Sequence, residues 1–282
     1  MMVAAVAALT LAGHAAAQQV EGTLKRIKDT GTIKIGFREN SPPFSYLQPR
    51  QEARRLLDRP LRGASHARPS RSSLLADLKI QYVPVTVETR VDAVVNGTVD
   101  IECGSTTTTL SRQEKVDFTS LTFLDGAGFL VARSSGIQGI TDLAGKRIGV
   151  ITGTTTERAL RRSFQKAGIT ATLVNMPDHN RGFAAVQGGQ ADAYASDRVL
   201  LVGLLVQANA ADKFALADQQ FSFEPYAFMV RRNDSAFRLV ANRTLARLYR
   251  SGDISPIFGR WFGMLGKPSP GLVVMYGCST PE

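Results

Sequence analysis

One stretch of the sequence gathers side chains that could hold a small anion. Between Glu102 and Thr119 the chain reads ECGSTTTTLSRQEKVDFT, in which Ser105 and four consecutive threonines stand shortly before Arg112. Hydroxyls and guanidinium groups donate hydrogen bonds, and a guanidinium pairs both oxygens of a carboxylate in parallel. The residue types therefore fit an anion site, and they fit equally well a solvated turn that caps a helix.

A second hydroxyl-rich turn lies further along the chain. The stretch GVITGTTTERAL places Thr154 and Thr155 between a predicted strand, Arg147 to Ile151, and a predicted helix. Backbone N–H groups at a helix N-terminus bind anions, so this turn is a second candidate anion site. The same threonines could be ordinary capping residues.

Two further residues could bind a charged ligand. Asp197 ends the predicted strand ADAYASD, and His179 follows Asp178 at the start of the predicted helix HNRGFAAVQGGQ. Asp197 could receive an ammonium group or cap a helix. His179 could be a ligand contact or simply a helix N-terminal residue.

The elements that must position these residues alternate between strands and helices. Predicted strands cover Thr32 to Phe37, LKIQYVPVT, GAGFLVARSS and ATLVNMPD, and a basic amphipathic helix covers SAFRLVANRTLARLYRSG. The alternation predicts an α/β fold with mostly parallel sheets. Two phrases, RVDAVVNGTVDIECGS and FAAVQGGQADAYASD, each read as a helix, a glycine turn and a strand ending in small polar residues. Because ligands bind beyond the carboxyl ends of strands in such sheets, we expect a ligand between two lobes.

The length and composition of the chain limit the number of domains and the class of protein. The chain has 282 residues, 44% hydrophobic and 21% charged, which allows one large globular domain or two moderate ones. Residues 1–17, within MMVAAVAALTLAGHAAAQQV, form an apolar run with a small-residue end, typical of a signal peptide, although no Lys or Arg precedes it. No later segment is apolar and long enough to span a bilayer, so we expect an exported, soluble mature protein.

Charge and cysteines leave alternatives open. A net charge of +10 raises nucleic acid as a partner, but no nucleic-acid-binding module is recognised. Cys103 and Cys278 are compatible with one disulfide or with two free thiols. We find no metal-ligand spacing, no phosphate loop and no Gly-x-Ser-x-Gly motif, so we predict no metal, no cofactor and no catalytic residue.

Several phrases together resemble the family 3 bacterial extracellular solute-binding proteins, the periplasmic amino-acid-binding proteins of ABC importers, and most of all their glutamate/aspartate-binding members. The phrases are GTIKIGFRENSPPFSYL, VNGTVDIECGSTTTTLSRQEKVDFT, DLAGKRIGVITGTTTER, DHNRGF, ADAYASD and LYRSGDISPIFGRWFG, in family order from about Thr23 to Gly263. The resemblance implies a type II two-lobed fold, each lobe a mostly parallel sheet flanked by helices, joined by a two-strand hinge. It places lobe 1 at 18–131 plus 230–282 and lobe 2 at 132–229.

The resemblance also implies ligand contacts. Arg112 matches the arginine that clamps the α-carboxylate, and Asp197 matches the carboxylate that receives the α-ammonium. Matching hydroxyl and N–H positions are Ser105, Thr107, Thr154 and Thr155. Arg38, Arg90 and His179 match the residues of acidic-ligand members that hold a second carboxylate, which is the group that two extra guanidiniums would compensate.

Three positions depart from the family or carry open roles. Val87 stands where acidic-ligand relatives often have a hydroxyl, which could shift the preference between glutamate and aspartate. The relatives' partner for Cys103 is here Phe228, so we expect neither that disulfide nor a bond from Cys103 to Cys278. Phe44 and Tyr46 are expected in the core or the cleft wall.

The resemblance stops between Gln48 and about Leu74. The stretch PRQEARRLLDRPLRGASHARPSRSS has seven arginines against two acidic residues, a net +5, and three prolines. Relatives have a strand near VGYSIDL and then a long helix here. Codons for Arg54 to Leu61 can be chosen that yield Val-Gly-Tyr-Ser-Ile-Asp-Leu when read one base later. We hypothesise that a compensated frameshift scrambles 49–76; an authentic arginine-rich insertion is the alternative.

The sequence therefore predicts a periplasmic, monomeric, non-enzymatic protein that delivers L-glutamate or L-aspartate to the membrane permease of an ABC importer. An exported enzyme on the same fold, such as a dehydratase-like protein, is one alternative. A non-functional frameshifted relative is another. A nucleic-acid binder is the third, favoured by the net charge alone.

Overall fold

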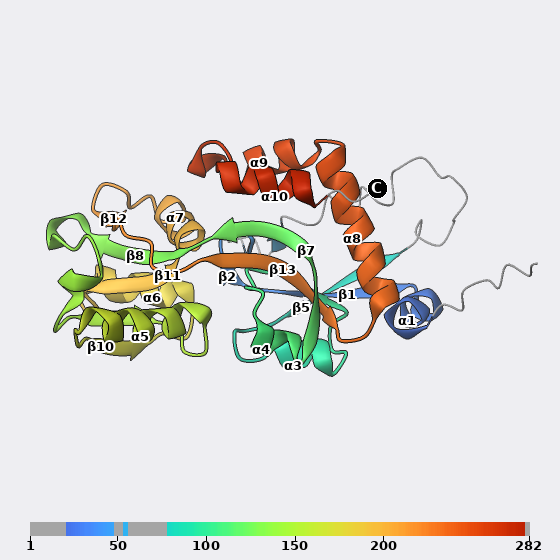
Figure 1. Cartoon of the computed structure of the whole chain (residues 1–282), viewed down its shortest axis with the longest axis horizontal. Helices are drawn as coiled ribbons and strands as arrows, with labels where there is room; N and C mark the ends of the chain where they lie inside the picture. The colour runs from blue at the N-terminus through green and yellow to red at the C-terminus, as the bar shows by residue number, and fades with distance from the viewer. Residues whose placement is uncertain (1–20, 48–52, 56–77, 280–282) are drawn as a thin grey trace, which may run out of the picture.

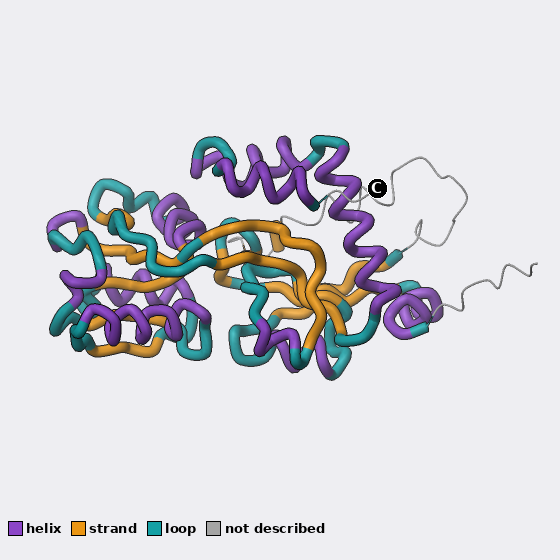
Figure 2. Tube along the Cα trace, viewed as in Figure 1, coloured by secondary structure: helices purple, strands orange, loops and turns teal. Residues whose placement is uncertain are grey.

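The computed structural model describes residues 21–47, 53–55 and 78–279 of the chain. Figure 1 shows two lobes side by side, each built around a sheet with helices on its faces. The long strands β7 (Val116–Asp125) and β13 (Glu224–Arg231) lead from one lobe toward the other (Figure 2). The two-lobed α/β fold expected from the sequence is thus confirmed.

The first lobe contains a five-stranded sheet in the order β5-β1-β6-β13-β7. Its remaining strands are β1 (Thr32–Phe37), β5 (Lys79–Pro84) and β6 (Ile101–Glu102). β5, β1 and β6 pair in parallel, and β13 pairs antiparallel with β6 and with β7. Four strands therefore point the same way and β13 opposes them, as expected for a mostly parallel sheet.

The second lobe repeats this arrangement in the order β10-β9-β11-β8-β12. The strands are β8 (Ala127–Ala132), β9 (Arg147–Val150), β10 (Thr172–Asn175), β11 (Ala193–Asp197) and β12 (Phe214–Leu216). β10, β9 and β11 are parallel, and β8 pairs antiparallel with β11 and β12. A small antiparallel sheet of β2 (Asn40–Ser41), β3 (Ser45–Leu47) and β4 (Ala53–Arg55) extends the first lobe.

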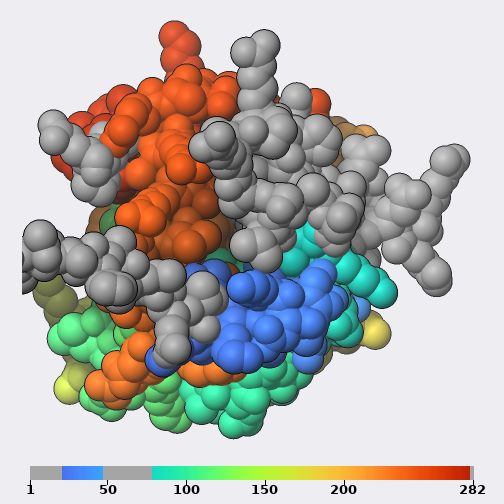
Figure 3. Space-filling model, turned by 90° about the vertical axis from the view of Figure 1, so that its right-hand side faces the viewer, coloured from blue at the N-terminus to red at the C-terminus, as the bar shows by residue number. Residues whose placement is uncertain are grey.

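Helices cover both sheets. They are α1 (Gly22–Thr30), α3 (Arg90–Val95), α4 (Leu110–Gln113), α5 (Thr155–Ala167), α6 (His179–Gln187), α7 (Arg198–Gln207), α8 (Ser235–Arg250), α9 (Ile254–Phe262) and α10 (Pro270–Cys278), with single 3₁₀ turns η2 (Arg133–Ser135), η3 (Ile140–Leu143) and η4 (Gly263–Leu265). Figure 3 looks onto the end of the first lobe, where α1 (blue) lies beside α8 (orange). Within the described part of the chain, no helix is long and apolar enough to cross a membrane.

The two repeated phrases occupy equivalent positions. RVDAVVNGTVDIECGS forms α3, a turn at Gly97 and β6, and FAAVQGGQADAYASD forms the end of α6, a glycine turn and β11. Gly97 adopts a φ of +70°, which a residue with a Cβ rarely adopts. β6 and β11 are each the middle strand of their sheet, so both phrases deliver their polar ends to the cleft.

The chain changes lobes just before β8 and again before β13. Among the described strands, β8 pairs with strands of the second sheet and β13 pairs with strands of the first. The boundaries expected at 131/132 and 229/230 fall inside these two strands. The difference arises because each strand belongs wholly to one sheet, so the crossings lie at Gly126 and in the segment 217–223.

An aromatic cluster packs beneath the crossing point. The ring centroids of Phe44 lie 5.2 Å from Phe123, 5.3 Å from Tyr226 and 5.0 Å from Phe262. Phe44 is buried, as predicted for a core aromatic. Such pairs add about 0.5–1.5 kcal/mol each beyond the area they bury. The cluster therefore fixes the start of β13 against the first lobe.

Most of the arginine-rich segment at 49–76 lies outside the described residues. Its residues 53–55 form β4, which pairs with β3. The predicted signal peptide at 1–17 also lies outside the described residues.

Candidate functional site

A polar cavity lies between the lobes, at the carboxyl ends of their parallel strands. Its empty volume is about 320 Å³. The side chains that line it are Arg38, Val87, Arg90, Ser105, Thr107, Thr154, Thr155, Thr156, His179, Ser196, Asp197 and Leu200. Eight of the nine predicted ligand-binding residues are in this set, and the structure thus brings them together. Arg112 is the exception.

Local structure explains why these residues meet. Arg38 follows β1, Ser105 lies shortly after β6 and Asp197 ends β11, so two strands of the first sheet and one strand of the second deliver these residues to the cleft between the sheets. His179 begins α6, with Asp178 capping the helix through a 2.8 Å bond from Arg181 N–H. His179 is therefore both a helix N-terminal residue and a cavity residue.

Three basic side chains gather at one end of the cavity. Arg38, Arg90 and His179 are 5%, 4% and 5% exposed. Burial and the neighbouring Arg90 lower the pKa of Arg38 to about 10. Burial, with Arg38 and Arg90 nearby, lowers the pKa of His179 to about 3, so its imidazole is neutral at physiological pH. Among the described residues, neither arginine has a carboxylate oxygen within salt-bridge distance.

Arg90 reaches a carboxylate only through a hydroxyl. Its Nη1 donates to Thr106 Oγ1 at 2.7 Å, and Thr106 Oγ1 donates to Glu102 Oε2 at 2.8 Å. Arg90 Nε and Glu102 Oε1 are buried and have no hydrogen-bond partner. A buried unmade bond costs about 1–3 kcal/mol, more for a charged group, so this end of the cavity has unsatisfied donor capacity.

His179 is held in place by the second sheet. Its Nδ1 lies 2.8 Å from Tyr194 Oη and 3.4 Å from Ser196 Oγ. If Nδ1 accepts from the tyrosine hydroxyl, the neutral ring carries its proton on Nε2 and is a donor there.

One acidic residue, Asp197, also lines the cavity. Asp197 accepts a hydrogen bond of 2.9 Å from Thr156 Oγ1 and another from the Tyr226 hydroxyl. Burial and the neighbouring Glu224 raise the pKa of Asp197. Burial and Asp197 likewise raise the pKa of Asp125, at the end of β7. The cavity wall thus carries both basic and acidic groups, which suits a ligand that carries both charges.

Thr154 and Thr155, in the second hydroxyl-rich turn, make different hydrogen bonds. Thr154 caps α5: its Oγ1 accepts from Glu157 N–H at 3.1 Å and donates to the Ile151 carbonyl at 2.7 Å. Thr155 Oγ1 donates to Glu224 Oε2 at 2.7 Å. The capping role left open for Thr154 is therefore real, although the residue also borders the cavity.

Arg112 is not among the residues that line the cavity. Its Nη1 donates to the Thr107 carbonyl at 2.6 Å. Burial, with Arg90 and Arg158 nearby, lowers the pKa of Arg112 to about 10. The guanidinium therefore holds the backbone of the hydroxyl run at Thr107, whose side chain lines the cavity.

Several site residues were missed by reasoning from the sequence. Glu224 is 2% exposed and accepts from Thr107, and Tyr226 and Tyr194 hold Asp197 and His179. The one signal for Glu224 was an acidic residue opening the otherwise apolar strand EPYAFMV. The tyrosines carried no signal, because a buried tyrosine is ordinary in a core.

The lobes touch across the cleft. Asn180 Nδ2 donates to Asn40 Oδ1 at 3.1 Å, and Thr107 Oγ1 lies 3.3 Å from Thr155 Oγ1. A Cβ on Gly203 in α7 would lie 2.5 Å from the Pro42 carbonyl oxygen, so a glycine is required where the second lobe meets the turn of the first. The structure is therefore a closed arrangement of the two lobes.

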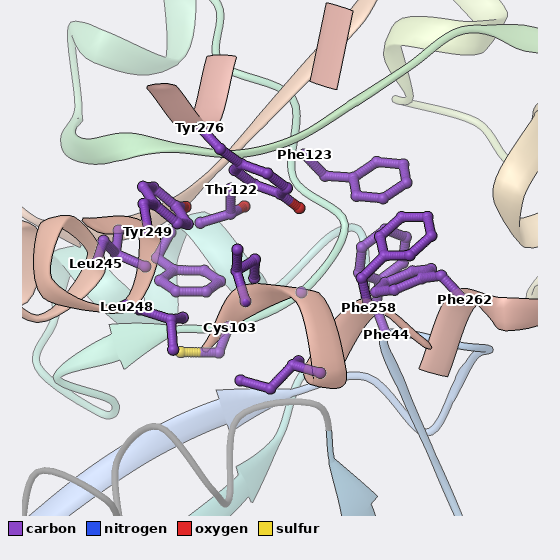
Figure 4. Close-up of a pocket in the computed structure, with 14 residues that line it drawn as sticks. Phe44, Cys103, Thr122, Phe123, Leu245, Leu248, Tyr249, Phe258, Phe262 and Tyr276 are labelled. Atoms are coloured by element: carbon purple, nitrogen blue, oxygen red, sulfur yellow. The ribbon is translucent and has the colours of Figure 1, made fainter. Parts of the chain in front are cut away.

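A second cavity, of about 570 Å³ empty volume, is apolar and is lined by residues of the first sheet and of α8, α9 and α10 (Figure 4). Phe44, Phe258 and Phe262 form one end, and Leu245, Leu248 and Tyr249 form the other. Cys103 and Phe228 both line it, and Cys103 and Cys278 are free. Within the described part of the chain, no group of three or more His, Cys, Asp or Glu could hold a metal ion.

Comparison with known proteins agrees with this architecture. Residues 70–264 match the family described as bacterial extracellular solute-binding proteins, family 3. The chain is 36% identical to an L-glutamate/L-aspartate-binding protein of Pseudomonas aeruginosa over 92% of this chain and 85% of the relative. It is 30% identical to a glutamate/aspartate import solute-binding protein of Escherichia coli (strain K12) over 88% of this chain and 82% of the relative.

Solved structures share the fold at lower identity. A solute receptor for L-cysteine of Neisseria gonorrhoeae has a TM-score of 0.75 at 22% identity, over 88% of this chain and 97% of that one. An ancestral amino-acid-binding protein, described as a precursor of cyclohexadienyl dehydratase, has a TM-score of 0.73 at 24% identity, over 86% of this chain and 100% of that one.

Proposed function

Because the chain belongs to family 3 of the bacterial extracellular solute-binding proteins, we propose that it captures an acidic amino acid, L-glutamate or L-aspartate, for an ABC importer. The observation that carries the proposal is the basic end of the cavity, where Arg38, Arg90 and neutral His179 are buried together. A second ligand carboxylate supplies the negative charge that this end lacks.

The ligand's three charged groups are distributed along the cavity. The side-chain carboxylate lies with Arg38 and Arg90, and the unpaired Arg90 Nε is a ready donor to it. The α-ammonium lies with Asp197, a carboxyl whose pKa is raised by burial and by the neighbouring Glu224. The resemblance assigns the α-carboxylate to Arg112, supported by Ser105 and by the N–H groups at the start of α5.

Selectivity follows from the burial of the charges. A neutral side chain such as that of glutamine would leave two buried guanidiniums without a counter-charge. Each lost hydrogen bond to a charged group costs about 1.5–3 kcal/mol, which weakens binding roughly 10- to 150-fold. Val87 lines the same cavity without a hydroxyl, so the preference between glutamate and aspartate rests on the basic residues and the cavity's length.

The remaining assignments are proposed on the support of the family membership. The protein acts outside the cytoplasmic membrane, in the periplasm, as a monomer that passes its ligand to a membrane permease. Capture without turnover is the proposed activity, in keeping with relatives that are named as binding proteins.

Calorimetric titration of the purified chain tests the proposal. L-Glutamate, L-aspartate and L-glutamine are titrated in parallel, and each ligand is recovered and analysed for chemical change. Binding of the acidic amino acids, with glutamine at least tenfold weaker and all ligands recovered intact, supports acidic capture. Equal binding of glutamine, or no binding by a cooperatively folded chain, refutes it, whereas an unfolded chain would point to the frameshift hypothesis for 49–76.

A further inference from the structure

Glu224 is a buried carboxylate that the proposed ligand contacts do not use. It opens β13, is 2% exposed and does not line the ligand cavity. Three hydroxyls donate to it: Thr107 to Oε2 at 2.6 Å, Thr155 to Oε2 at 2.7 Å, and Ser222 to Oε1 at 2.6 Å. Glu224 therefore stands directly behind two of the hydroxyls that face the ligand.

The direction of these hydrogen bonds follows from the charge on the acceptor. A hydroxyl has a single proton to donate, and an ionised carboxylate can only accept. Thr107 Oγ1 and Thr155 Oγ1 also lie 3.3 Å from each other. Their contacts to Glu224 are shorter than that, and bonds to an ionised acceptor are about twice as strong as neutral ones. Both protons consequently point to Glu224 and away from the cavity.

We propose that Glu224 is a positioning residue that fixes the Thr107 and Thr155 hydroxyls as acceptors, so that both present lone pairs to the ligand's α-ammonium. The inference rests on the proposed function in one respect, that the ligand is an α-amino acid. An ammonium group donates only, so it matches two acceptors, whereas a group that must accept finds no donor there.

The same contacts couple the acceptor pair to lobe closure. Thr107 belongs to the first lobe, Thr155 begins α5 of the second, and Glu224 lies on a strand next to the hinge. Both hydroxyls reach Oε2 together only when the lobes are close. The ammonium-selective pair is thus assembled by closure and is absent when the lobes are apart.

The test compares L-glutamate with L-2-hydroxyglutarate, whose α-hydroxyl can donate or accept. Affinities are measured by calorimetry for the wild type and for Glu224→Met, which keeps a side chain of similar length without an acceptor. We expect L-glutamate to bind about 10- to 100-fold more weakly in the variant and L-2-hydroxyglutarate to change less than about threefold. Equal changes for the two ligands, or no change, would overturn the proposal.

A mutant cycle separates hydrogen-bond direction from simple charge attraction. If Glu224 acts through the hydroxyls, Glu224→Met changes the ligand preference less than about threefold in a Thr107→Val, Thr155→Val background. A loss that persists in that background means that the charge of Glu224 acts on the ligand directly, and the proposal falls. If the methionine variant does not fold, the same cycle is run with the isosteric Glu224→Gln. The proposal is then supported if this change lowers the preference for L-glutamate over L-2-hydroxyglutarate only in the protein that keeps both threonines.

Two controls complete the experiment. Glu114→Met makes the same change at an exposed glutamate of the first lobe and should leave both affinities unaltered. A wild type that binds another α-amino acid in place of L-glutamate refutes the acidic ligand only, and that amino acid and its α-hydroxy analogue then form the test pair. A wild type that binds no α-amino acid refutes both proposals.

Discussion

Replacing Arg38 by methionine should move ligand binding and stability in opposite directions. Arg38 is 5% exposed, and burial together with the repulsion of Arg90 lowers its pKa from 12.5 to about 10. At about 1.4 kcal/mol per pKa unit, that difference corresponds to about 3 kcal/mol of destabilisation of the charged native state. Methionine has a similar length and fits an irregular buried space without a charge. We expect the ligand-free Arg38→Met protein to gain roughly 1–3 kcal/mol in unfolding free energy.

The opposite result is expected with ligand present. Losing the guanidinium removes charged hydrogen bonds to the second carboxylate, so L-glutamate should bind about 10- to 150-fold more weakly. Bound ligand stabilises the native state by RT ln(1 + [L]/Kd), about 2.7 kcal/mol at 100 times Kd. At an L-glutamate concentration that saturates the wild type only, the difference between the two melting temperatures should therefore become smaller or change sign.

Thermal unfolding with and without L-glutamate, paired with calorimetric titration, measures both effects. One kcal/mol corresponds to about 2–4 °C in a protein of this size. Arg243→Met is the matched control, because Arg243 is exposed on α8 and should change stability by less than about 0.5 kcal/mol. A ligand-free Arg38→Met protein that melts below the wild type, or one that binds L-glutamate with unchanged affinity, would refute the reasoning.

Three other perturbations test separate parts of the site and core. His179 has its pKa lowered to about 3, so it stays neutral in the folded state while an unfolded histidine takes up a proton below about 6.5. The wild type should therefore lose stability as pH falls from 6.5, by about 2 kcal/mol at pH 5, relative to His179→Gln, and parallel pH profiles in urea unfolding would contradict this. Tyr226→Phe removes a donor to Asp197 and should weaken ligand binding several-fold in calorimetry. Tyr276→Phe, in the separate apolar cavity, is the control that should leave the affinity unchanged, and equal affinities of the wild type and Tyr226→Phe would remove Tyr226 from the site. Cys103 and Cys278 are free, so a thiol reagent should label the exposed Cys278 in the native protein and both cysteines after denaturation without reductant. A disulfide between the two cysteines would instead give no labelling in either state.

Much of the fold could be predicted because its signals are local. The strand predicted at Thr32 to Phe37 is β1, and the helix predicted before the glycine turn of RVDAVVNGTVDIECGS is α3, with Asn96 as its C-cap. Strand alternation and glycine turns depend on neighbours within a few residues, so they can be read along the chain. Lobe boundaries could not be placed to the residue, because β8 and β13 take their sheet from partners far away in sequence.

The residue types that line the cavity could be predicted from the sequence, but the hydrogen bonds between them could not. Each predicted residue follows the end of a strand or begins a helix, and in parallel α/β sheets those ends meet at one edge. The exception was Arg112, whose contact with the Thr107 carbonyl depends on how the turn folds back.

The sequence by itself determined most of the charged and hydroxyl groups that line the cleft, since strand ends and helix starts are set by local residues; Thr156 and Ser196 also line it and were not predicted. Only the tertiary structure decided what those groups can do. Thr107 and Thr155 are 48 residues apart, and Glu224 is 117 and 69 residues from them, yet their oxygens lie within hydrogen-bond distance. A hydroxyl donates or accepts according to its nearest partner, and that partner comes from another part of the chain through the closure of two lobes.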